Sequence, residues 1–215
     1  MLEANVKAAF EKVKAGFGLP IDVHLNIYKT REEAENALGR KVEPHEFAFA
    51  DYNHGNPSVT FIQDFWPLKN HSRKKECLEG VIAEDFGHIK YDSTHKDLTA
   101  VHVDPELSMH VYQFWAVRNG IESGFGDPLL EFYKIATTKT KPVANADVGE
   151  IIGVFPALAA LSEKYDVKQV IAKYIQSLPR ETRKEVEKYT FLLDAKSYDN
   201  ESDLLVDWKS AKRSS

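Results

Sequence analysis

The sequence predicts an α+β protein in which a small mixed sheet with an edge hairpin packs on one long helix, and an all-helical lobe follows. Three observations lead to this class. Segments of strand type fall within the first 62 residues, where helical segments alternate with them. The later segments show helical spacing only. The chain has 215 residues, which is enough for one substantial core, alone or with a smaller helical lobe.

The first elements are expected to be a helix, a strand and a second helix. Apolar residues recur at helical spacing over residues 3–16, namely Val6, Ala9, Phe10 and Val13. Residues 21–28 alternate between apolar and polar, which is typical of a strand with one buried face. Thr30 then begins a helix, because Glu33 three residues later completes a capping box, and Gly39 ends it.

Two further strands, residues 47–52 and 59–62, are expected to form a hairpin. Residues 53–58 between them are rich in Asn, Gly and Pro, which favour tight turns. A helix over residues 73–91 follows the hairpin directly, with its apolar residues at helical spacing. We therefore expect this long helix to pack against the sheet.

Only helices are expected after residue 104. Pro105 suits the first turn of a helix that reaches about Glu122. Glycines and Pro128 end that helix, and Asp127 is expected to cap the next one. A Lys- and Thr-rich linker is predicted at 137–144, and the remaining helices are predicted at 145–161, 167–176 and 179–193. The chain is expected to divide into an α/β part, a helical lobe and a partly disordered tail, which cover residues 1–104, 105–195 and 196–215.

Composition limits the compartment and the partners. The net charge of −5 gives no electrostatic case for nucleic acid. No apolar run approaches the roughly 18 residues that span a membrane, and the first residues lack an apolar signal core. The single cysteine, Cys77, excludes a disulfide framework and a multi-cysteine zinc site. We therefore expect a cytoplasmic protein with neither nucleic acid nor a membrane as its partner.

The turn Glu84-Asp85-Phe86-Gly87-His88 in the long helix is the best candidate for a functional site. Glu84 and His88 are one turn apart, so their side chains point the same way, and Asp85 neighbours His88 three residues on. Two carboxylates and an imidazole thus lie inside an otherwise apolar segment. Burying such groups costs on the order of several kcal/mol unless they are paired, hydrogen-bonded or bound to a metal.

This layout resembles the zincin metallopeptidase fold over roughly residues 20–135. In zincins a strand hairpin precedes a helix that carries H-E-x-x-H, often with Gly before the second His. The two His bind zinc, and the Glu activates the metal-bound water. In this sequence His88 matches the second ligand, Glu84 stands where the first His would be, and Asp85 stands where the catalytic Glu would be. The motif is therefore a degenerate form of the zincin signature.

The resemblance to the Glu-zincin branch implies one divalent metal held by Glu84, His88 and Glu122, with Asp85 as the general base. In that branch the third ligand is a Glu on a later helix, often preceded by Asn, and Glu122 follows Asn119 in this way. An O,N,O ligand set tolerates zinc and also suits iron or manganese. Asp85 is one methylene shorter than the usual base, so slow or absent peptide hydrolysis is expected.

Two functions stay open at this point. One is a divalent-metal-dependent hydrolase of the peptidase type. The alternative is a catalytically inactive zincin-like protein that holds a peptide or protein partner in the cleft between the sheet and the helical lobe. The departures at Glu84 and Asp85 favour the alternative. A purely structural role is also open, in which Glu84, Asp85 and His88 form a hydrogen-bonded triad that locks the helix to the sheet, and Glu122 is a solvent-exposed carboxylate.

Overall fold

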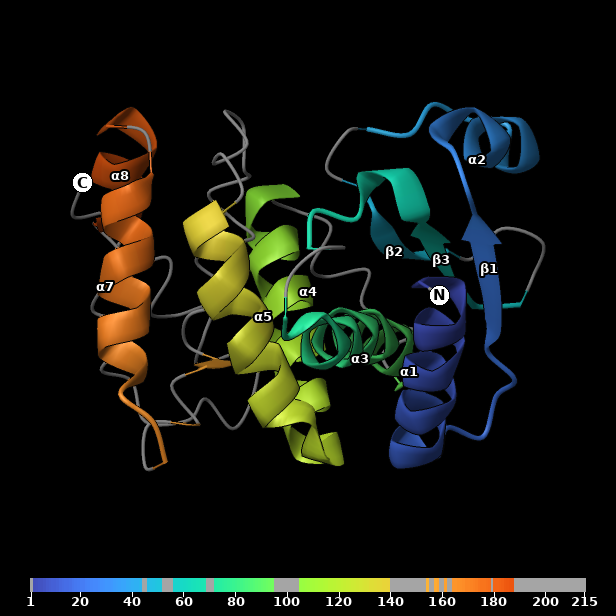
Figure 1. The fold of residues 1–215 in the computed structure, drawn as a ribbon. Coiled ribbons are helices and arrows are strands. Elements are labelled where there is room, and N and C mark those ends of the chain that lie inside the picture. The colour runs from blue at the N-terminus through green and yellow to red at the C-terminus, as the bar shows by residue number, and fades with distance from the viewer. Residues whose placement is uncertain are drawn as a thin grey trace. The chain divides into compact units, whose positions relative to one another are not determined.

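The computed structural model describes residues 2–43, 46–51, 56–68, 72–94, 105–139, 164–178 and 180–187, together with the single positions 154, 157, 158 and 161. Within these residues the protein is α+β, with a three-stranded mixed sheet in its N-terminal part and helices elsewhere (Figure 1). The predicted fold class is confirmed. None of the helices described in these ranges is long and apolar enough to cross a membrane.

The chain divides into two compact units. The first comprises Met1–Lys90 and Asn119–Tyr133, and the second comprises Tyr91–Arg118 and Lys134–Ser215. The first unit is therefore built from two separate stretches of chain. The predicted boundary at residue 104 and the predicted tail lie outside the described residues, and both stay predictions.

The first stretch of this unit contains the elements that the sequence predicts, and a 3-10 turn that it does not. The predicted elements are α1 (Leu2–Phe17), β1 (His24–Tyr28), α2 (Arg31–Leu38), β2 (Ala48–Asp51), β3 (Ser58–Ile62) and α3 (Lys74–Thr94). The 3-10 turn is η2 (Gln63–Phe65), and the last four residues of α3 belong to the second unit. The capping box of α2 is present, because the Thr30 hydroxyl accepts the Glu33 N–H at 3.2 Å while the Glu33 carboxylate accepts the Thr30 N–H at 3.4 Å. Gly39, with φ 66°, ends α2 as expected.

Strand β3 lies at the centre of the sheet. It pairs in parallel with β1 and antiparallel with β2. The predicted hairpin is confirmed with β2 at the edge, and residues 53–55 of its predicted turn lie outside the described residues. Every residue of β3 is buried, whereas most residues of β1 and β2 are partly exposed. On one face of the sheet, α2 contributes Ala34 to a buried cluster with Val42 and Ile62.

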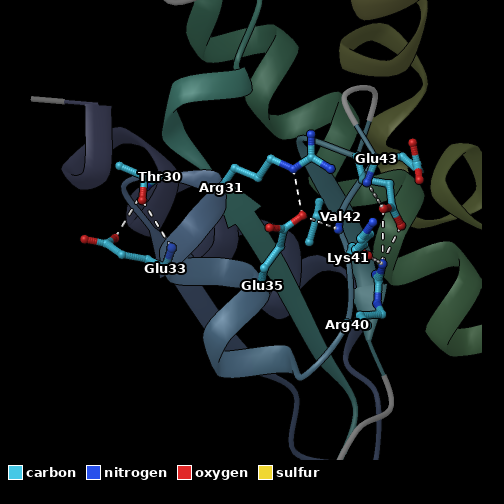
Figure 2. A network of polar contacts seen from close by, with 9 residues as sticks. Thr30, Arg31, Glu33, Glu35, Arg40, Lys41, Val42 and Glu43 are labelled. Atoms are coloured by element: carbon cyan, nitrogen blue, oxygen red, sulfur yellow. Dashed lines mark hydrogen bonds and ion pairs between the residues drawn. The ribbon is translucent and has the colours of Figure 1, made fainter.

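A polar network holds the segment between α2 and β2, as Figure 2 shows. The Glu35 carboxylate accepts hydrogen bonds from the Val42 backbone N–H at 3.0 Å and from Arg31 Nε at 2.8 Å. These contacts lower the pKa of Glu35. The guanidinium of Arg40 binds both carboxylate oxygens of Glu46, each at 3.1 Å. The connection from β1 through α2 to β2 is therefore held by side chains, one of which also binds the backbone N–H of Val42.

Aromatic side chains join α1 to α3 in the core of the first unit. The Phe86 ring of α3 lies 5.4 Å from Phe10 and 5.5 Å from Phe17, both of α1. Phe17 also stacks on Phe125, with ring centroids 6.0 Å apart. Such tilted and offset pairs are favourable beyond the area that they bury. They fix the face of α3 that carries Phe86 against α1.

The connection after α4 (Pro105–Gly120) differs from the prediction. Instead of a break and a cap at Asp127, the chain continues through a π-helical turn, η4 (Ile121–Phe125), into α5 (Gly126–Lys139). Gly124, with φ 91°, forms a kink there that an L side chain rarely allows. Helix α5 also runs through residues 137–139, the beginning of the predicted linker, because Thr and Lys only weakly disfavour extension of a packed helix.

The described part of the second unit contains two further predicted helices, α7 (Val167–Ser177) and α8 (Arg180–Glu187). The Asp166 side chain caps α7 by accepting the Gln169 N–H at 3.0 Å. Most of the predicted helix at 145–161 lies outside the described residues, but Val154, Ala157 and Leu158 are helical and buried.

Candidate functional site

The candidate turn lies in the part of α3 that belongs to the first unit. Asp85 is buried, with 5% of its surface exposed, while Glu84 and His88 are partly exposed. Phe86 on the same turn faces the core of the unit. The helical period therefore places the three predicted polar residues in different environments. The Asp85 carboxyl is buried, whereas the Glu84 carboxylate and the His88 imidazole lie nearer the surface.

The Asp85 carboxyl accepts a hydrogen bond from the backbone N–H of Ala50, in strand β2. The direction of that N–H follows from the hairpin ladder. Ile62 donates its N–H to the Phe47 carbonyl at 2.8 Å, so the alternation of an antiparallel pair turns the backbone groups of Ala50 away from β3. Asp85 thus satisfies an outward-pointing donor on the edge strand and ties α3 to the sheet.

Burial raises the pKa of Asp85 well above its usual value, and the neighbouring charge of Glu84 raises it further. The hydrogen bond from Ala50 acts in the opposite direction and is the smallest of the three effects. The second carboxyl oxygen, Oδ2, is buried and has no hydrogen-bond partner within the described residues. A protonated Asp85 is the form that this environment favours, because ionisation would place an uncompensated charge in the core.

Glu84 is held by a residue from a distant part of the chain. The Tyr133 hydroxyl, on α5, donates a hydrogen bond to Glu84 Oε2 at 2.5 Å. A bond of this length to a carboxylate is charge-assisted and stronger than a neutral one. It holds the Glu84 side chain toward α5, which belongs to the first unit as far as Tyr133.

Asn119 supplies a third polar contact to the turn. Its buried side-chain amide donates to the Gly87 carbonyl at 3.1 Å. Next to this contact, the end of α4 approaches α3 closely at Gly120. A Cβ at Gly120 would lie 3.4 Å from the Ala83 carbonyl of α3 and 2.7 Å from the Leu129 side chain of α5. The end of α4 therefore packs on α3 through backbone and amide groups at the position of the candidate turn.

The predicted site residues lie on two elements of the first unit. Glu84, Asp85 and His88 share one turn of α3, whereas Glu122 lies exposed on η4. Among the residues that the structure describes, no three His, Cys, Asp or Glu side chains are grouped so that they could hold a metal ion. The set Glu84, His88 and Glu122 therefore stays a prediction, and the described geometry does not supply a three-ligand centre from it.

Sequence reasoning missed the partners of the turn. The contacts of Ala50 and Tyr133 with the turn have no signal in the sequence, since an alanine in a strand and a tyrosine in a helix are ordinary core residues. Asn119 was visible as the Asn before Glu122, but its partner, the Gly87 carbonyl, is a backbone group. Comparison of the chain with known protein families, with curated proteins and with solved structures gives no match.

Proposed function

We propose that this chain is a non-catalytic binding protein with a zincin-like layout, which holds an extended peptide segment of a protein partner. The observation that carries the proposal is the burial of Asp85, which stands where the zincin base would be, and its bond to Ala50. A general base must be ionised and within reach of the water that it activates. Asp85 is buried and bonded to Ala50, and burial favours its protonated form.

The contacts around the turn support a binding role over a hydrolytic one. Ala50 N–H, an outward donor of the edge strand, is already bonded to Asp85 and is not available to a substrate backbone. Glu84 is engaged by Tyr133 at 2.5 Å. The polar residues of the turn thus contribute to packing between α3, β2 and α5. The net charge of −5 favours a protein partner over nucleic acid, and the single, buried cysteine suits the cytosol.

Metal content and hydrolysis test this proposal directly. Purified full chain is loaded with zinc, iron or manganese, dialysed, and measured by mass spectrometry beside the variants His88→Ala and Asp85→Asn. The proposal predicts no stoichiometric metal that depends on His88, and no cleavage of a mixed peptide substrate. One equivalent of metal lost in His88→Ala, together with peptide cleavage lost in Asp85→Asn, would overturn it in favour of the metal-dependent hydrolase.

A further inference from the structure

Strand β1 is the outermost strand of the sheet on the side opposite β2 (Figure 1). Its hydrogen bonds to β3 determine which of its backbone groups point outward. His24 donates its N–H to the Pro57 carbonyl at 3.1 Å, and the parallel register pairs His24 with Ser58. In a parallel pair, successive residues of a strand direct their backbone N–H and C=O groups to opposite edges of the strand. His24, Asn26 and Tyr28 therefore direct these groups toward β3, and Leu25 and Ile27 direct theirs away from it. Within the described residues, β1 has a neighbouring strand on one side only.

Side chains close both ends of this open edge. Before the strand, Lys14 Nζ donates to the Val23 carbonyl at 3.0 Å and to Asp22 Oδ1 at 2.7 Å. After the strand, the Lys29 N–H donates to Glu33 Oε2 at 2.8 Å. As far as the structure describes the chain, the outward backbone groups that remain unbonded are those of two residues, Leu25 and Ile27. Charged side chains at the flanks of an edge strand limit uncontrolled pairing, so this edge offers a short window.

The side chains along the window are suited to a pleated neighbour. Leu25 and Ile27 point to one face of the sheet and are partly exposed, although both are apolar. Asn26 points to the other face, where its amide donates to the Ser58 hydroxyl at 3.0 Å. An added strand would cover the apolar pair and place its own alternate side chains beside them. The window therefore selects for apolar residues at alternate positions with a polar residue between.

We infer that the edge of β1 at Leu25 and Ile27 binds an extended segment of a partner protein by strand addition. This inference rests on the proposed binding function and gives it a site. The size of the window decides the occupant. Two residues offer four backbone hydrogen bonds, whereas a stable dimer interface buries roughly 1,200 Å² or more. A short segment that binds and releases matches such a window better than a second copy of this chain.

Amide hydrogen exchange in the uniformly labelled full chain tests the site without any ligand. The N–H groups of Leu25 and Ile27 are expected to exchange at least 100-fold faster than those of Asn26 and Tyr28, which face β3. Equal protection of all four amides overturns the inference, because the edge is then already paired. Protection of Leu25 and Ile27 that grows with protein concentration also overturns it, since a second copy is then the occupant.

Selection from a phage library of random heptapeptides supplies the probe for binding. Peptides with alternating apolar residues are expected to bind the full chain and to protect the Leu25 and Ile27 amides. Ile27→Pro removes one outward N–H and is expected to weaken these peptides at least tenfold. The matched control is Ala48→Pro, which removes an outward N–H on the opposite edge strand and is expected to change affinity less than twofold.

A control with a modified peptide distinguishes the loss of backbone hydrogen bonds from misfolding of the Ile27→Pro variant. The selected peptide, resynthesised with N-methyl groups at the amides that pair with β1, keeps its side chains and is expected to bind at least tenfold more weakly. Peptides that bind equally to Ile27→Pro, or that protect amides elsewhere, overturn the site but leave the proposed binding function standing. Failure to select any peptide overturns the site, and His88-dependent metal with peptide cleavage overturns the proposed function itself.

Discussion

The carboxyl of Asp85 on α3 and the backbone N–H of Ala50 on β2 are joined by a hydrogen bond in the core of the first unit. A buried backbone donor without a partner costs about as much as a lost hydrogen bond, and edge strands present such donors in a row. Asp85 satisfies one of them from a helix. This contact accounts for the buried carboxyl of Asp85, the residue predicted as a general base, through the stability of the sheet edge.

Asp85→Asn is expected to be tolerated and Asp85→Ala is not. The amide oxygen of Asn accepts a hydrogen bond from the Ala50 N–H as a protonated carboxyl does. The Asp85→Asn substitution is therefore expected to lower the free energy of unfolding by about 1 kcal/mol or less. Alanine removes the acceptor of that N–H and opens a small void at the buried Asp85 position, which costs about 2–3 kcal/mol. Urea unfolding monitored by circular dichroism measures both. Equal destabilisation by the two variants would contradict the role given to this bond.

The stability contributed by Asp85 is expected to fall as the pH rises. Its pKa is higher in the folded protein than in the unfolded chain, so the folded state keeps a proton that the unfolded state loses above about pH 4. The contribution of Asp85 to the free energy of unfolding is therefore complete below about pH 4. Above that pH it decreases by up to about 1.4 kcal/mol per pH unit, until the pH reaches the pKa of Asp85 in the folded protein. The difference in unfolding free energy between the wild type and Asp85→Asn isolates this slope. A difference that increases with pH would mean that Asp85 is ionised in the fold.

Tyr133→Phe is expected to destabilise the protein by about 1 kcal/mol, because the hydroxyl bond to the partly exposed Glu84 is lost while the ring remains. A double-mutant cycle with Glu84→Leu, which removes the acceptor, should give a coupling of similar size. Tyr165→Phe removes a hydroxyl that takes no part in this contact and serves as the control. Additive effects of Tyr133→Phe and Glu84→Leu would contradict a direct interaction.

Gly80→Ala is expected to be strongly destabilising, although alanine is the better helix former. A Cβ at this position would overlap the backbone carbonyl of Pro128, which cannot move as a side chain could. The expected loss is about 2–3 kcal/mol, larger than the roughly 1 kcal/mol that the helix propensity of alanine returns. Lys75→Ala, at an exposed position of α3, is the matched control and should change the midpoint of thermal unfolding very little.

The thiol of Cys77 is expected to react slowly in the folded protein. Burial, together with the charges of Glu131 and Glu76, raises its pKa to about 11, so little thiolate forms at pH 8. Labelling with a disulfide reagent should proceed quickly only in denaturant. Rapid labelling of the native chain would show that this part of α3 opens readily.

Local rules were enough to predict most of the elements but not their contacts. The capping box of Thr30 and the alternation in β1 are encoded by neighbouring residues, so both were predicted correctly. The π-helical turn with Gly124 was predicted as a simple break, because a glycine marks a change of direction without saying which one. The bond from Tyr133 to Glu84 spans 49 residues, and no periodic pattern reports such a pair.

The two-stretch construction of the first unit has a consequence for synthesis on the ribosome. The stretch that ends at Lys90 emerges without Asn119 and Tyr133, the residues that bind Gly87 and Glu84. At about 5–20 residues per second, those two partners follow several seconds later. During that interval the nascent chain carries a partly apolar helix whose later neighbours do not yet exist. Chaperones that bind exposed apolar helices would meet this protein at that stage.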